Sequence, residues 1–206
     1  PSIKEEEFCR AVALGLFDYL RKSRSRGFVV SLSGGADSTA VTCLAGLARR
    51  LSSESLGPKG LAKKLPHLPP EALADSKALI KSLLVCVYQA TDNSSNSSRE
   101  AAHAVAAGVG AGFMEWEVGA IVTAYTDMVS KTVGRPLTWE KDDISLQNIQ
   151  ARVRGPGAWL LANLRDSLLL ATSDRSEASV GYATMDGDTC GGLAPIGGVD
   201  KSFLLS

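Results

Sequence analysis

A buried strand that runs directly into a glycine-rich turn and a helix most constrains the fold of this chain. Residues 28–32 read Phe-Val-Val-Ser-Leu, an apolar run with two adjacent β-branched residues that is typical of a strand buried on both faces. The turn Ser33-Gly34-Gly35-Ala36-Asp37-Ser38 follows without a spacer, and apolar residues then recur at helical spacing to about residue 50. Strand, turn and helix in this order open a β-α-β unit, so the turn predicts a parallel α/β fold.

The rest of the chain alternates between predicted helices and strands. Periodicity predicts helices over 5–22, 101–109, 119–132 and 142–164, the last broken at Gly155-Pro156-Gly157, and strands over 83–88, 113–118 and 167–172. A short helix should follow residues 173–177, and another should start at Lys201. Pro, Gly and Ser punctuate residues 51–82, which we expect to be an insertion with one or two short helices. We therefore expect a doubly wound, Rossmann-like parallel sheet flanked by helices.

Composition excludes several classes of protein. The 206 residues suit one domain, and 22 basic against 22 acidic residues argue against a nucleic-acid-binding surface or an acidic tail. There is no apolar run long enough for a membrane span and no signal peptide pattern at the start. Four scattered cysteines without a pair exclude a zinc or disulfide framework and indicate a reducing, cytoplasmic location, with Cys43 and Cys86 expected to be buried. With only two histidines in the sequence, a histidine-based nucleophilic triad or a multi-histidine metal site is not expected.

The glycine-rich turn has the chemistry of an anion site. Paired glycines let the backbone approach a ligand closely, and the helix that follows offers free N–H groups and the positive end of its dipole. Ser33 and Ser38 add hydroxyl donors, which suits a diphosphate. Asp37 would repel phosphate unless a magnesium ion lay between them. Taken alone, the same residues could form a tight turn capped by aspartate and serine.

Several motifs in one order identify a family resemblance. Ser-Gly-Gly-x-Asp-Ser after a buried strand resembles the pyrophosphate loop of the N-type ATP pyrophosphatases. Downstream, the chain is similar to NAD synthetases over nearly its whole length, in four stretches: Asn148-Ile149-Gln150-Ala151-Arg152-Val153-Arg154, Thr172 to Glu177, Val180 to Thr184, and Gly187 to Ile196 followed by Lys201. The fold that this resemblance implies is adenine nucleotide alpha hydrolase-like.

The resemblance implies a two-step amidation. The nicotinate carboxylate of deamido-NAD would attack the α-phosphate of ATP, giving an adenylate and pyrophosphate, and ammonia would then displace AMP to make NAD. In-line attack on phosphorus depends on charge neutralisation more than on covalent help, which is consistent with a site that has no histidine base.

The resemblance also assigns roles to residues. ATP would be bound by Ser33, Gly34, Gly35, Asp37, Ser38, Thr172 and Lys201, with Asp37 and Lys201 also the expected catalytic residues and Asp37 and Glu177 the Mg²⁺ ligands. The dinucleotide would contact Asn148, Glu177, Tyr182, Ala183, Thr184, Met185 and one of Arg152 or Arg154. The serine-rich stretch with Ser94, Ser95 and Ser98 matches a loop that orders over the site.

Departures from the family pattern point to one branch of it. Met185 stands where ammonia-using members often have lysine, and the insertion at 51–82 fits a subset of the glutamine-using members. Asp174 stands where asparagine is usual and adds a negative charge beside Glu177. Nothing in residues 1–206 resembles the glutaminase domain of those enzymes, so either this chain is a synthetase domain cut from something longer or its ammonia comes from elsewhere. The tail that the family has after Lys201 is also missing. The resemblance further implies a homodimer that buries residues 119–164.

Two other readings stay open at this stage. Another enzyme with a pyrophosphatase loop, such as a GMP synthetase or a tRNA-thiolating enzyme, would share the turn, although thiolating enzymes usually bring catalytic cysteines or RNA-binding domains. A non-catalytic nucleotide-binding module could also retain the loop, but it predicts loss of Asp37, Glu177 or Lys201, and all three are present.

Overall fold

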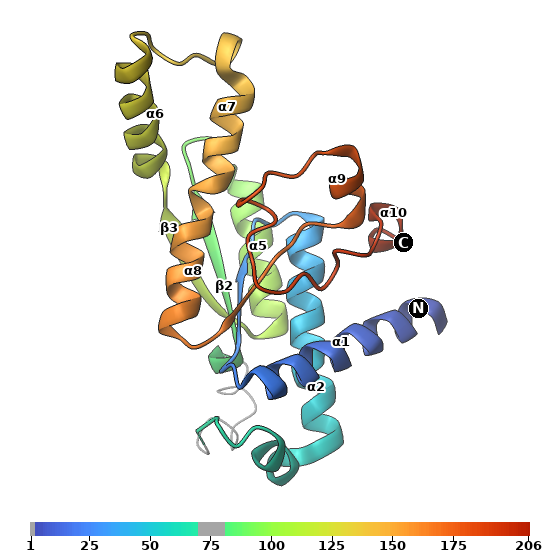
Figure 1. Cartoon of the computed structure of the whole chain (residues 1–206). Helices are drawn as coiled ribbons and strands as arrows, with labels where there is room; N and C mark the ends of the chain where they lie inside the picture. Colours follow the sequence, from blue (N-terminus) through green and yellow to red (C-terminus); the bar gives the residue numbers. More distant parts are fainter. Residues whose placement is uncertain (1–2, 70–80) are drawn as a thin grey trace.

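The computed structural model describes residues 3–69 and 81–206, and within these ranges four parallel strands form one sheet (Figure 1). In chain order the strands are β1 (Phe28–Ser31), β2 (Leu84–Ala90), β3 (Gly112–Glu117) and β4 (Leu168–Leu170). Their spatial order is β3-β2-β1-β4, so β3 lies at an edge, as its alternating sequence suggests. The prediction of a parallel, doubly wound sheet is confirmed.

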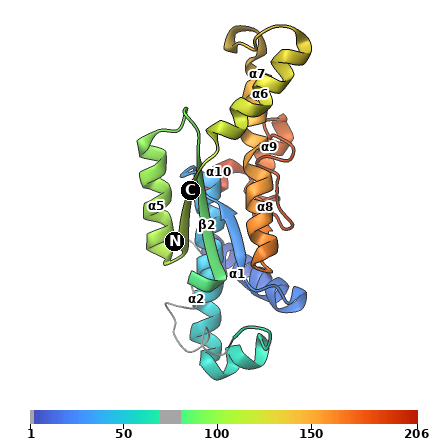
Figure 2. The same cartoon turned by 90° about the vertical axis from the view of Figure 1, so that its left-hand side faces the viewer.

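Helices cover both faces of the sheet (Figure 2). On one face, α2 (Ala36–Lys64) and α5 (Asn96–Val109) pack on the strands, and α1 (Ile3–Ser23) packs on α2. On the other face lies α8 (Arg154–Leu164), whose buried small residues Ala158 and Ala162 fit against the sheet. Because side chains alternate along a strand, Val30 enters the larger core with α2 and Val29 enters the smaller core under α8.

Two helices form a hairpin that projects beyond the carboxyl end of the sheet (Figure 1). They are α6 (Gly119–Val133) and α7 (Trp139–Arg152), and α7 continues into α8. α6 has no buried residue, although it is the most apolar of these helices in sequence. Its exposed side chains include Tyr125, Met128 and Val129, so the hairpin presents an apolar surface to its surroundings.

The chain closes with two short helices on either side of a long loop. Asp174 caps α9 (Arg175–Val180), and Asp200 caps α10 (Lys201–Leu204), each accepting a hydrogen bond from a backbone N–H of the first turn. The expected short helix is present, but it starts at Arg175 and so includes part of the predicted turn at 173–177, whereas the expected helix start at Lys201 is confirmed. No helix in the described part of the chain is long and apolar enough to cross a membrane.

Three details of the sequence prediction are wrong. The helix after the glycine-rich turn does not end near residue 50, since α2 continues to Lys64 across a break at Gly57, where φ is 61°. The predicted break at Gly155-Pro156-Gly157 falls earlier, between α7 and α8, because proline is tolerated in the first turn of a helix, where its missing N–H has no partner to lose. Cys86 is buried as expected, but Cys43 is exposed. Residues 70–80 of the predicted insertion lie outside the described residues.

Candidate functional site

A cavity of about 240 Å³ opens where the strand order changes direction. The chain moves outward from β1 to β2 and β3, then returns to place β4 on the other side of β1. In open α/β sheets such a switch point leaves a crevice at the carboxyl ends of the strands, and ligands bind there. The cavity is lined from β1, β2, β4, α8 and the loop before α5, and its lining includes Ser31, Ser33, Gln89, Ser98, Arg154 and Thr172.

The glycine-rich turn borders this cavity in a tightly fixed conformation. Gly34 has φ of +83°, and a Cβ there would lie 2.4 Å from the carbonyl oxygen of Ser98, so only glycine fits without strain. The two serine hydroxyls are 3.1 Å apart, and Ser38 Oγ also donates to the carbonyl of Gly35 and accepts from the N–H of Ser33. The hydroxyls predicted to donate to phosphate therefore hold the turn together in this structure, which leaves the N–H groups at the start of α2 as the free donors.

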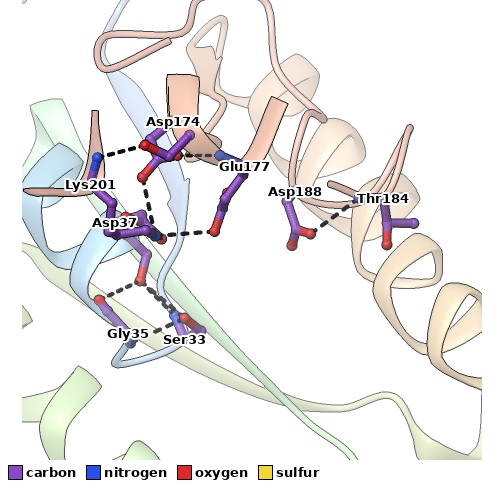
Figure 3. A network of polar contacts seen from close by, with 10 residues as sticks. Ser33, Gly35, Asp37, Asp174, Glu177, Thr184, Asp188 and Lys201 are labelled. Carbon is purple, nitrogen blue, oxygen red and sulfur yellow. Dashed lines mark hydrogen bonds and ion pairs between the residues drawn. The ribbon is translucent and has the colours of Figure 1, made fainter. Parts of the chain in front are cut away.

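Beside the turn, one ammonium is shared by three carboxylates (Figure 3). Lys201 Nζ lies 2.5 Å from Asp37 Oδ2, 3.1 Å from Asp174 Oδ2 and 3.1 Å from Glu177 Oε1. Asp37 comes from the first turn of α2, Asp174 and Glu177 from the start of α9, and Lys201 from the start of α10. Three acids and one base leave this cluster formally two units negative, so it attracts cations.

The cluster shifts the ionisation of its members. Burial alone would lower the pKa of Lys201, but its contacts with Asp37, Asp174 and Glu177 outweigh burial and raise that pKa above the ordinary value. Burial raises the pKa of Glu177, and the nearby Asp37 adds to this, while the hydrogen bond from Lys201 opposes it. Among the described residues, Asp37 Oδ1 is buried and has no hydrogen-bond partner. Lys201 therefore stays protonated beside Asp37 and Glu177, and Oδ1 of Asp37 accepts no hydrogen bond.

Arg154 and Arg152 have different surroundings, although they are only two residues apart. Arg154 lines the cavity, and its guanidinium donates to the carbonyls of Gln89 and Gln150 while burial lowers its pKa. Arg152 is exposed and donates from Nε to the carbonyl of Met185. The structure places Arg154 at the cavity, whereas Arg152, at the end of α7, contacts the loop that carries Met185.

The chain is similar to proteins of one known family. The family model described as NAD synthase matches residues 8–204. The chain belongs to the NAD synthase family. The predicted resemblance is confirmed, and the alternative of a GMP synthetase-like enzyme is not favoured.

Several of the similar proteins are glutamine-dependent NAD(+) synthetases. A glutamine-dependent NAD(+) synthetase from Oryza sativa subsp. indica is 31% identical over 220 residues, covering 97% of this chain and 30% of the relative. A crystal structure of a glutamine-dependent NAD(+) synthetase from Cytophaga hutchinsonii has a TM-score of 0.90 and 48% identity over 98% of this chain and 36% of that one. The structure of another, from Acinetobacter baumannii in complex with ADP, has a TM-score of 0.74 and 26% identity over 97% of this chain and 31% of that one. The chain therefore spans about a third of these relatives.

The structure brings one part of the predicted NAD synthase site together. Asp37, in the turn from Ser33 to Ser38, and Glu177 both lie within ion-pair distance of Lys201. Thr172, Ser94 and Ser98 line the adjoining cavity. Ser95 instead caps α5. The predicted dinucleotide contacts on the 182–185 loop lie apart from that cavity. Tyr182 and Met185 are 78% and 70% exposed, Ala183 and Thr184 are half-buried, and none of the four lines the cavity. Asn148 accepts a hydrogen bond from the Thr184 hydroxyl and so ties this loop to α7.

Three polar residues at the site were missed by the sequence analysis. Gln89 is buried at the end of β2 and donates to the hydroxyl of Ser31, and both line the cavity. Asp188 also lines the cavity, near Thr184 (Figure 3). A polar side chain at the carboxyl end of an apolar strand is the signal that could have found the first two, since that edge of a parallel sheet carries the ligand sites.

Proposed function

We propose that this chain carries out the ATP-dependent amidation of deamido-NAD to NAD, forming a C–N bond and releasing AMP and pyrophosphate. The observation that carries the proposal is the meeting of Asp37, Glu177 and Lys201, from three distant segments, beside a cavity at the switch point of the sheet. The ADP bound by the relative from Acinetobacter baumannii supports an adenine nucleotide as one substrate.

In this proposal the turn and the lysine bind the triphosphate. The N–H groups at the start of α2 donate to phosphate oxygens, and Lys201 neutralises their charge as a point charge. Thr172, which follows β4, contacts ATP, and Arg154, which lines the same cavity, binds the dinucleotide. Neutralising the phosphate charge and orienting the two substrates then suffice for the nicotinate carboxylate to attack the α-phosphate of ATP. In the second step, ammonia needs only access to the adenylate to displace AMP.

A magnesium ion fits the acidic residues of this site. Among the described residues no three His, Cys, Asp or Glu side chains are already arranged around an empty metal position, since the three acids here surround an ammonium. The donors are nevertheless hard oxygens, and Asp37 Oδ1 is buried without a partner. Asp37 and Glu177 would hold the ion, which when bound would offset negative charge on the phosphates.

The remaining proposals concern the surroundings of the site. We propose that the chain is a synthetase domain with an insertion at 51–82, that it works in the cytoplasm, and that it forms a homodimer through residues 119–164. The exposed apolar side chains of α6 and α8, such as Met128 and Leu160, support the dimer, since patches of this kind mark interfaces. Ammonia would come from a glutaminase, as the glutamine-dependent relatives suggest.

The direct test is product formation. The protein is mixed with ATP, Mg²⁺, ammonia and deamido-NAD, and NAD is detected by its fluorescence after reduction by alcohol dehydrogenase. Asp37→Asn should lower the rate of pyrophosphate release by about 10²-fold or more while circular dichroism is unchanged. Asp166→Asn, at the opposite end of β4, is the matched control and should leave the rate unchanged.

Other outcomes would point elsewhere. Unchanged pyrophosphate release by the Asp37 variant would remove that residue from the mechanism. Product from xanthosine monophosphate instead of deamido-NAD would indicate a GMP synthetase-like enzyme. Nucleotide binding with no product from either substrate would indicate a non-catalytic module.

A further inference from the structure

The three carboxylates around Lys201 differ sharply in burial. The side chain of Asp174 is 0% exposed, whereas those of Asp37 and Glu177 are 19% and 22% exposed. A buried carboxylate is strongly destabilised when it loses its counter-ion, because its charge is then left without solvent or partner. Asp174 is therefore the acid that most needs the ammonium to stay close.

Asp174 uses its two oxygens for different purposes. Oδ1 accepts a hydrogen bond of 2.8 Å from the N–H of Glu177 and so caps α9, while Oδ2 lies 3.1 Å from Lys201 Nζ (Figure 3). The capping role needs only an oxygen, which asparagine also has. The ion pair needs the charge, so the two roles can be separated by a single substitution.

Asp174 and Lys201 also belong to one unit of backbone. The N–H of Lys201 donates to Ser176 Oγ at 3.0 Å, and Arg175 pairs with Asp200 at 2.9 Å. These contacts join the start of α9 to the start of α10. Asp37, by contrast, is carried by α2. Lys201 can thus leave Asp37 while its pairing with Asp174 is kept.

A divalent cation and the ammonium compete for the same two acids. If Asp37 and Glu177 bind the metal of a metal–nucleotide complex, Lys201 must give up its contacts with their oxygens, because two cations at one pair of carboxylates repel each other. Asp174 Oδ2 is the contact that remains, and from there the ammonium still borders the turn where phosphate would lie.

We propose that Asp174 is a positioning residue that gives the Lys201 ammonium a carboxylate of its own and so frees Asp37 and Glu177 for the divalent cation. The inference rests on the proposed function, since it assumes that a metal–nucleotide complex binds here. In an asparagine variant the ammonium has no other acid to hold it, so it competes with the metal for Asp37 and Glu177.

The test measures metal binding rather than turnover. Mn²⁺ is titrated into the protein with a non-hydrolysable ATP analogue, and free Mn²⁺ is followed by electron paramagnetic resonance. Asp174→Asn, which keeps the cap, should weaken Mn²⁺ binding about five- to tenfold. Asp166→Asn removes the same charge from the opposite end of β4, where Asp166 lies 3.9 Å from Arg26, and should change binding less than about twofold.

A double-mutant cycle then separates positioning from direct ligation. Once Lys201→Met has removed the competing ammonium, adding Asp174→Asn should change the Mn²⁺ affinity less than about twofold. An equal loss with and without Lys201 would mean that Asp174 acts on the metal directly, and unchanged affinity in the single Asp174 variant would also overturn the proposal. If the unaltered protein binds no Mn²⁺ with the nucleotide, the proposed function itself fails.

Discussion

At the scale of single residues, Gly34 is a position where the backbone leaves little room for a side chain. We expect Gly34→Ala to destabilise the fold by at least about 2 kcal/mol, because φ of +83° disfavours a side chain and the new Cβ would meet the Ser98 carbonyl. Thermal unfolding followed by circular dichroism should show a melting temperature lower by roughly 4–8 °C.

The neighbouring glycine supplies the control for this prediction. Gly35 has φ of −78°, and a Cβ there would meet only the Ser33 hydroxyl, at 3.3 Å, which needs only a small shift to make room. Gly35→Ala should therefore melt within about 2 °C of the unaltered protein. Equal losses in the two variants would show that the close approach to Ser98 does not limit stability.

The sequence predicts which residues belong to the site only where those residues are part of a local motif. Asp37, Glu177 and Lys201 follow from motifs that are read along the chain. The burial of Asp174 and the pair formed by Gln89 and Ser31 depend on which strands become neighbours, and the sequence does not state that order. The use of the Ser33 and Ser38 hydroxyls within the turn is likewise a matter of geometry that residue type does not reveal.

At the scale of elements, the α6–α7 hairpin is fastened by one arginine. Arg135 donates to both carboxylate oxygens of Asp142, at 2.7 and 2.8 Å, and the N–H of Thr138 donates to the same carboxylate at 3.0 Å. The hydrogen bonds from Arg135 hold the pKa of Asp142 well below its ordinary value of 3.8. A lowered pKa means that this stabilisation is present above pH 3.8 and is lost as the pH falls below it.

The hairpin should therefore loosen in acid. We expect faster hydrogen exchange at the Thr138 amide relative to its intrinsic rate, together with a change in Trp139 fluorescence, as the pH falls below 3.8, with little change above it. Asp142→Asn should show the loosened state already at neutral pH, whereas Asp143→Asn should behave like the unaltered protein. Identical pH profiles in the two variants would show that the Arg135 pair does not hold the hairpin.

Elements with strong periodicity were predictable, and their ends were not. The strands and the helices around them follow from patterns of apolar residues. The extension of α2 to Lys64 was missed because Gly57 and Pro58 usually end a helix, but here they only break it and Leu61 beyond them is buried in the core. Tertiary packing thus overrides the local signal.

At the scale of the whole molecule, the apolar surface of α6 predicts association of two copies. Met128 is 61% exposed, and we expect Met128→Glu to shift a dimer towards monomer by at least about tenfold in dissociation constant. Sedimentation velocity across a range of concentrations measures this. Leu14→Glu, at a 67% exposed apolar position on α1, is the control and should leave the dimer intact. A monomer at high concentration before any substitution would contradict the proposal.

The two halves of the charged cluster come from remote parts of the chain. Asp37 and Lys201 are 164 residues apart, so the ion pair between them cannot form before residue 201 has been synthesised. During translation, which runs at about 5–20 residues per second, a nascent chain displays its glycine-rich turn for many seconds before position 201 leaves the ribosome. Over that interval the turn lacks its lysine, so Asp37 gains its ion-pair partner only once residue 201 has emerged from the ribosome.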